Sequence, residues 1–240
     1  LCNLAEMQIW QGEWQAALKN IKLATTLSQN TMYRRGEAQA LITHSMALFS
    51  LGFEEEALPL LQEGLRLSKE LTMPDNLIVA RLLLAKIALL KKEPHIAQSH
   101  LLYGLRHSNS SDPEHYFWAL QALQSQALSA QKQSQKAQRL LDETEENLPQ
   151  LPWPRRIETM IYCAQARAIC REKERATQLA NFAYQKALEL DMKGWALEAL
   201  GVLAKHASSP QKSIQLLQKM LNHFSMNLST KQASQLQKRF

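Results

Sequence analysis

Residues 51–64 read LGFEEEALPLLQEG, and forty positions earlier residues 11–24 read QGEWQAALKNIKLA. In both segments an alanine follows a glycine by five positions, and a large aliphatic residue follows that alanine by four. The alanine column continues along the chain at intervals of 40, 40, 40, 39 and 37 residues, and comprises Ala17, Ala57, Ala97, Ala137, Ala176 and Ser213. A fixed period of this length is typical of a repeat architecture.

Two further columns keep the same register. Twelve residues before each member of the alanine column stands another small residue, in the series Ala5, Ser45, Ala85, Ser125, Ala164 and Gly201. Four residues after it stands an aliphatic residue, in the series Ile21, Leu61, Leu101, Leu141, Ala180 and Leu217. Small side chains let two helix backbones approach, and larger ones fill the grooves between ridges. The columns therefore predict pairs of packed helices.

Polar segments divide these helices. We expect turns inside the pairs at residues 11–13, 52–54, 92–94, 132–134, 172–174 and 208–210. We expect breaks between pairs at residues 28–31, 72–75, 108–113, 148–154 and 191–193. Asp75 and Asp112 are predicted to cap helix starts, because a carboxylate accepts hydrogen bonds from the first free backbone N–H groups. No alternating strand pattern occurs, which predicts an all-α fold.

The repeat resembles the tetratricopeptide repeat (TPR) family. The resemblance rests on two sets of residues, namely Leu4, Gly12, Trp14, Ala17, Leu18, Ile21 and Ala24, and Leu51, Gly52, Phe53, Ala57, Leu58, Leu61 and Gly64. It implies a right-handed α-solenoid of about six helix–turn–helix repeats. The family repeat is near 34 residues, so this is a long variant, similar to the TPR arms of bacterial multidomain signalling regulators. The turn glycine is lost after the second repeat and is replaced by Lys92, Lys132, Arg171 and Ser208.

We predict a single superhelical domain over residues 1–240. Its repeats are expected at residues 1–30, 31–73, 74–111, 112–150, 151–191 and 192–227, followed by a polar C-terminal capping helix at 228–240. Ser229 and Thr230 are expected to cap that last helix. Since the chain begins at Leu1 inside a helical pattern, we expect it to be a segment of a longer protein.

Charge and cysteine content narrow the possible partners and the compartment. The net charge is +6, and residues 121–240 carry 17 basic against 10 acidic side chains. Such a balance is weaker than a dense basic stripe, and aromatic residues do not alternate with the basic ones, which argues against a nucleic-acid partner. Three cysteines make no disulfide framework, which favours reduced thiols in the cytoplasm. No apolar run approaches the ~20 residues of a membrane span.

Candidate binding residues are expected on the first helix of each pair, which lines the concave face in the TPR family. Projection from the small columns places there Glu6, Trp10, Gln39, Thr43, Met46, Lys86, Gln126, Glu158, Tyr162, Gln165, Trp195 and Glu198. Amides at these positions can pair with a peptide backbone, and aromatic side chains can anchor a partner's side chains. The alternative for each residue is that it contacts the next repeat or water.

Other polar groups are expected to be structural. Cys163 and Cys170 lie seven apart and are expected to be buried. The acidic run at residues 142–146, which is followed by Arg155, Arg156 and Arg167, is expected to form a solvated helix face with some ion pairing. Trp153, in an extended Pro-rich linker, either fills the seam between repeats four and five or offers an exposed anchor; we favour the seam.

The sequence predicts a protein that is not an enzyme and that has no cofactor or metal, because no phosphate loop, nucleophile elbow or metal-ligand spacing occurs. The favoured function is a scaffold that binds a peptide or a partner helix in its concave groove. The alternative is a regulatory arm that senses a ligand or peptide and controls an attached kinase or ATPase module. The oligomeric state is left open.

Overall fold

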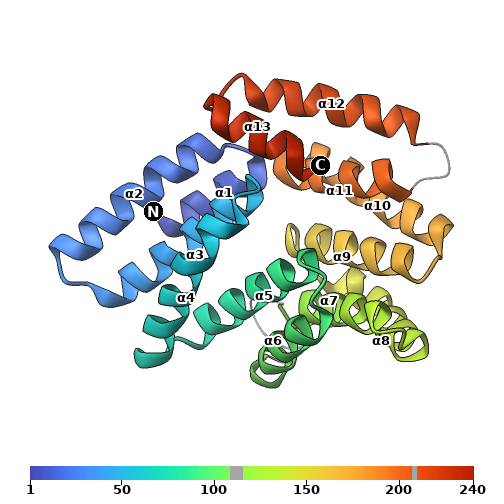
Figure 1. Ribbon diagram of the computed structural model, residues 1–240, viewed down its shortest axis with the longest axis horizontal. Helices are drawn as coiled ribbons and strands as arrows, with labels where there is room; N and C mark the ends of the chain where they lie inside the picture. The colour runs from blue at the N-terminus through green and yellow to red at the C-terminus, as the bar shows by residue number, and fades with distance from the viewer. Residues whose placement is uncertain (109–115, 207–209) are drawn as a thin grey trace. The chain divides into compact units, whose positions relative to one another are not determined.

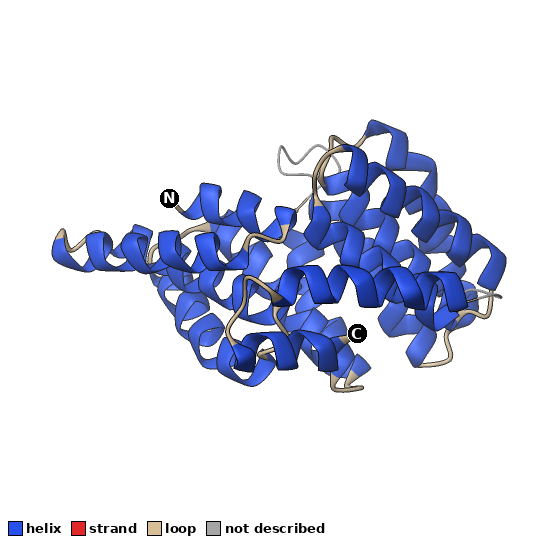
Figure 2. Ribbon diagram, turned by 90° about the horizontal axis from the view of Figure 1, so that it is seen from above, coloured by secondary structure: helices blue, strands red, loops and turns tan. Residues whose placement is uncertain are grey.

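The computed structural model describes residues 1–108, 116–206 and 210–240, which form α-helices and no strand (Figures 1 and 2). The all-α helical-repeat prediction is therefore confirmed, while the handedness of the superhelix stays a prediction. The helices in chain order are α1 (Cys2–Gln11), α2 (Trp14–Asn30), α3 (Arg34–Ser50), α4 (Glu54–Glu70), α5 (Pro74–Leu90), α6 (Pro94–His107), α7 (Tyr116–Ala130), α8 (Ser134–Asn147), α9 (Arg155–Ile169), α10 (Lys173–Glu189), α11 (Lys193–His206), α12 (Gln211–Ser225) and α13 (Thr230–Arg239), with a 3-10 turn η1 (Leu148–Gln150).

The chain divides into two compact units. Unit 1 comprises residues 1–83 and 219–240, and unit 2 comprises residues 84–218. Both boundaries fall inside helices, after Leu83 in α5 and after Gln218 in α12. The sequence predicts one continuous array of repeats, and this division does not follow the repeat borders.

Within each unit, helices pack in the order of the chain. In unit 1, α1 contacts α2, α2 contacts α3, and α3 contacts α4. In unit 2 the same rule joins α6 to α11 in succession. The first helices of successive pairs also touch, since α1 contacts α3, α7 contacts α9, and α9 contacts α11. The first helices therefore form an inner layer in each unit, as a repeat array requires.

The small-residue columns lie in the core. The members of the alanine column from Ala17 to Ala176 have no exposed surface, and Ser213 alone in that column is half-buried. The other two columns are buried throughout. Gly64 shows why such residues are needed, because a Cβ on it would lie 2.8 Å from Cγ1 of Ile42 on the neighbouring helix. The predicted helix-pair register is confirmed.

Eight helix ends share one left-handed turn conformation. Gly12 has a φ of 79°, its N–H donates to the carbonyl of Ile9, and the next N–H donates to the carbonyl of Gln8. This pair of hydrogen bonds is the Schellman motif, which satisfies carbonyls left free at a helix end. Lys92 repeats the pattern with a φ of 60°. The same left-handed conformation closes six further helices, at Met32, Gly52, Thr72, Lys132, Arg171 and Asp191. By contrast, α6 ends on an extended Ser108 and α8 on a right-handed Leu148. Replacement of the turn glycine by Lys92, Lys132 and Arg171 therefore leaves the left-handed turn conformation unchanged.

Some predicted boundaries are wrong by one to three residues. The fifth turn inside a pair precedes Lys173, where α10 begins, rather than spanning residues 172–174. Asp75 is not an N-cap: α5 begins at Pro74, which suits a first helical position, so Asp75 lies in the first turn. Its charge still favours the positive end of the helix dipole. The predicted cap Asp112 and most of the turn at 208–210 lie outside the described residues.

The C-terminal helix α13 belongs to unit 1 with the first two repeats. Ser229 caps it as predicted, since its side chain accepts a hydrogen bond from the N–H of Gln232, and the Gln232 side chain returns one to the Ser229 N–H. The sequence predicts a polar cap on the sixth repeat. The structure instead packs α13 against the turn between α3 and α4, where Gln235 donates to the carbonyl of Gly52.

Candidate interaction surface

A polar network occupies the inner layer of unit 2, centred on the Tyr162 hydroxyl of α9. That oxygen accepts a hydrogen bond from Nζ of Lys86 at 2.8 Å. The hydroxyl donates to Oε1 of Glu158, one helical turn earlier, at 2.7 Å. Arg155 pairs with the other carboxylate oxygen of Glu158. One tyrosine thus connects α5 with an ion pair on α9.

Aromatic rings surround the cations of this network. Nζ of Lys86 lies 5.0 Å from the centroid of the Tyr162 ring and 5.7 Å from that of Trp195 on α11. The two rings meet edge to face, with centroids 6.5 Å apart. Cζ of Arg155 lies 3.9 Å from the centroid of Tyr116 on α7. Distances below about 6 Å allow cation–π attraction, so the rings stabilise both charges.

Gln126 of α7 fastens the network to α9. Its side-chain amide donates to the backbone carbonyl of Tyr162 at 3.0 Å and to Oε1 of Gln165 at 3.1 Å. Gln165 follows Tyr162 by three positions and lies on the same face of α9. The amide donors of Gln126 are therefore already used inside the protein.

Electrostatics keep Tyr162 protonated. Burial raises the pKa of its hydroxyl well above the usual value. The charge of Glu158 and its hydrogen bond raise the pKa further, and Glu198 on α11 adds to the effect, while Arg155 opposes it. Tyr162 therefore serves as a permanent hydrogen-bond donor to Glu158 at neutral pH.

The structure brings together all seven predicted residues of unit 2. Contacts connect Lys86, Gln126, Glu158, Tyr162, Gln165 and Trp195, and Glu198 acts electrostatically on Tyr162.

Burial separates these seven into two groups. Gln126, Glu158, Tyr162 and Trp195 are buried, whereas Lys86, Gln165 and Glu198 are half-buried. The half-buried side chains form part of the protein surface, and the buried side chains lie beneath them and support them. Nε1 of Trp195 is buried without a hydrogen-bond partner, which is uncommon for an indole N–H.

The predicted residues of unit 1 form a looser set on α1 and α3. Gln39 donates to Oδ1 of Asn3 at 3.0 Å. Thr43 is buried and donates to the backbone carbonyl of Gln39, one turn back on its own helix. The remaining three, Glu6, Trp10 and Met46, are half-buried.

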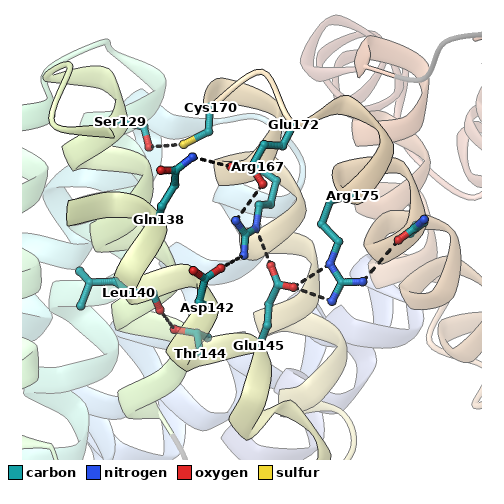
Figure 3. Close-up of polar contacts among 11 residues, drawn as sticks. Ser129, Gln138, Leu140, Asp142, Thr144, Glu145, Arg167, Cys170, Glu172 and Arg175 are labelled. Carbon is teal, nitrogen blue, oxygen red and sulfur yellow. Dashed lines mark hydrogen bonds and ion pairs between the residues drawn. The ribbon is translucent and has the colours of Figure 1, made fainter. Parts of the chain in front are cut away.

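A second cluster contradicts the predicted solvated face in part: Asp142, Glu143 and Glu146 are exposed, whereas Arg167 and most of the Glu145 side chain are buried. Arg167 of α9 is buried, and its guanidinium donates to Asp142 at 2.5 Å, Glu145 at 2.7 Å and Glu172 at 2.8 Å (Figure 3). Arg175 of α10 binds the other oxygen of Glu145. Burial by itself lowers the pKa of the Arg167 guanidinium. The hydrogen bonds to Asp142 and Glu145 outweigh this effect and raise the pKa.

This Arg167 cluster joins α8, α9 and α10. Asp142 and Glu145 are three apart, so they share one face of α8. That spacing is the only signal in the sequence, and it is as common on solvated helices as at buried sites. A buried ion pair often contributes more to the choice of one packing than to stability. We therefore read the cluster as a device that sets the register of three helices.

Two cysteines and Trp153 lie outside the two clusters described above. Cys163 is buried as predicted, and burial raises the pKa of its thiol, which keeps it unreactive. Cys170, also expected to be buried, is instead half-buried at the end of α9, with its sulfur 3.1 Å from Oγ of Ser129. Trp153 is exposed, and Arg156 stacks over its ring at 4.9 Å. The predicted role of Trp153 as a seam filler is therefore wrong.

Among the described residues, no group of three or more His, Cys, Asp or Glu side chains is arranged to hold a metal ion. Within the same residues, no helix is long and apolar enough to span a membrane. 

Comparisons with known proteins find no matching family model, and no curated protein or solved structure matches significantly.

Proposed function

We propose that this chain is a TPR-like interaction scaffold that holds a peptide segment or a partner helix on the inner layer of its helices. The observation that carries the proposal is the network of unit 2, where four first helices bring cationic, amide, aromatic and carboxylate groups to one place. Interaction sites on proteins commonly combine aromatic anchors with a few placed polar groups.

The buried part of the network supports preorganisation. Tyr162 and Glu158 are bound to each other, Lys86 donates to Tyr162, and Arg155 pairs with Glu158. Little side-chain freedom is therefore lost when a partner binds. The half-buried residues Lys86, Gln165 and Glu198 then present both signs of charge and an amide. A segment with mixed polar side chains and an accessible backbone suits such a surface better than a uniformly acidic or basic one.

The test removes two of the three half-buried groups, Gln165 and Glu198, and spares the buried ones. A displayed library of random peptides is selected on the wild-type chain, and recovered peptides are titrated by fluorescence anisotropy. The double variant Gln165→Ala with Glu198→Ala is expected to bind at least about tenfold more weakly, which corresponds to about 1.4 kcal/mol. Its thermal melt should stay close to that of the wild type.

A matched control lies on the second helices of the same unit. Gln185→Ala with Glu146→Ala removes the same two residue types from exposed positions on α10 and α8. This variant should bind every recovered peptide as the wild type does. Failure to recover any peptide, or equal loss of affinity in both double variants, would refute the proposed surface.

A further inference from the structure

The C-terminal helix α13 is docked in unit 1 almost entirely by polar side chains. Among its residues only Leu236 is buried. Lys231, Gln235 and Arg239 are spaced four apart, so they lie along one face of the helix. All three side chains contact the end of α3 or the start of α4.

The surface on which α13 lies offers backbone carbonyls at the C-terminal end of α3. Nε2 of Gln235 donates to the carbonyl of Gly52 at 2.5 Å, and the guanidinium of Arg239 donates to the carbonyl of Phe49. Cζ of Arg239 also lies 4.4 Å from the centroid of the Phe49 ring. The Phe49 carbonyl also accepts a hydrogen bond from the Gly52 N–H at 3.0 Å, and since a carbonyl oxygen has two lone pairs it can accept from Arg239 as well.

Gly52 allows α13 to approach this closely. A Cβ on Gly52 would lie 3.1 Å from the backbone oxygen of Gln235 and 3.3 Å from Cβ of Arg239. Its φ of 86° suits glycine as well. The turn between α3 and α4 is thus fitted to a helix backbone that lies directly on it.

Charge complementarity adds to the contact. Nζ of Lys231 lies 2.7 Å from Oε1 of Glu56 and 5.1 Å from the centroid of the Phe53 ring. Arg239 also pairs with Glu54 at 3.7 Å. Residues 219–240 contain four basic and no acidic side chains, whereas the first turn of α4 carries three glutamates.

We propose that this surface is a docking site for a short basic helix with the pattern Lys-x3-Gln-Leu-x2-Arg, and that α13 is its exchangeable resident. The docking face is defined by Phe49, Gly52, Phe53, Glu54 and Glu56. A partner protein that carries such a helix binds there by displacing α13.

Two properties make α13 exchangeable. A ten-residue helix is marginally stable by itself, so its order depends on docking. The Lys231–Glu56 pair is exposed on both sides, and exposed pairs are weak and screened by salt. The docking face therefore holds its own helix loosely enough for a competitor of the same chemistry to replace it.

The test uses the full chain and a fluorescent peptide of residues 226–240 as the probe. In the full-length release variant, Lys231→Glu with Arg239→Glu, the resident helix no longer fits the acidic face. We expect the peptide to bind this variant at least tenfold more tightly than the wild type, in which α13 competes. Binding should weaken as the salt concentration is raised. A peptide with the same two charge reversals should not bind.

Reversal of the receptor charges supplies the second arm. Glu54→Lys with Glu56→Lys in the otherwise wild-type chain repels its own α13, so this variant should bind the reversed peptide and should not bind the wild-type peptide. Glu55→Lys is the matched control, since Glu55 lies exposed in the same turn and makes none of the described contacts with α13. Equal binding of both peptides, or binding insensitive to receptor reversal, would overturn the proposal.

Hydrogen–deuterium exchange of the wild type tests exchangeability without any substitution. Amides of α13 should exchange faster than those of α3, and faster still at high salt. Slow exchange of α13 that is independent of salt would refute a loosely held resident. None of these variants alters the inner layer of unit 2, so the two proposed surfaces succeed or fail separately.

Discussion

Arg167 and Glu145 form an ion pair at 2.7 Å in which only 7% and 8% of the two side chains are exposed. The two residues lie on neighbouring helices, α9 and α8, and Glu145 also binds Arg175 of α10 (Figure 3). A single carboxylate thus ties three helices together in the middle of unit 2.

Removal of Arg167 should therefore be costly. Arg167→Met removes the buried partner of Glu145 and leaves this buried carboxylate with only the half-exposed Arg175, so we expect a loss of about 3 kcal/mol in the free energy of unfolding. Urea denaturation measures this loss. Arg167→Met with Glu145→Met should be less destabilised than Arg167→Met alone, because the poorly compensated buried carboxylate is then absent as well. A double variant less stable than the single one would contradict this account.

Tyr162 should make the protein sensitive to alkaline pH. Its pKa is raised in the folded state, so above the ordinary tyrosine value of about 10 the unfolded chain loses a proton that the folded chain keeps. The unfolded state then binds fewer protons, and the free energy of unfolding falls as pH rises. Tyr162→Phe should lack this contribution, which denaturation at a series of alkaline pH values measures. The same dependence in both proteins would assign the effect to other groups.

The left-handed turn at Lys132 should be open to improvement. A non-glycine residue at positive φ is strained, so Lys132→Gly should raise the free energy of unfolding by about 1 kcal/mol. Arg139→Gly, at an exposed position inside α8, should lower it by about 1 kcal/mol instead. Thermal melts of the two variants should shift in opposite directions, and shifts of the same sign would argue against the Schellman geometry.

The alanine column should not tolerate large side chains. Ala57 has no exposed surface, so Ala57→Leu is expected to cost about 1–3 kcal/mol through overpacking. Gln62→Leu, on the exposed side of the same helix, should be nearly silent. Coincident thermal melts for these two variants and the wild type would mean that the helix-pair register is wrong.

Much of the candidate site could be predicted, because the periodicity of a single helix determines which residues lie on the same face. Glu158, Tyr162 and Gln165 are four and three residues apart, so their common face follows from the sequence. Their burial did not follow, since it depends on how closely α7 and α11 approach α9. Gln126 is expected from the sequence to face an open groove, but its side-chain amide donates hydrogen bonds to Tyr162 and Gln165.

The sequence by itself determined the repeat, the helix pairs and most turns, because each depends on residues within about forty positions of one another. Ala57 indicates a close contact between paired helices, and Gly52 indicates a turn. Both can be recognised from nearby residues in the sequence. Only the tertiary structure decided that Arg167 is buried and that α13 lies against Gly52, since each contact joins helix faces whose meeting no local pattern records. Charged residues suit water and an ion pair equally well, so their sequence pattern is the same in both surroundings.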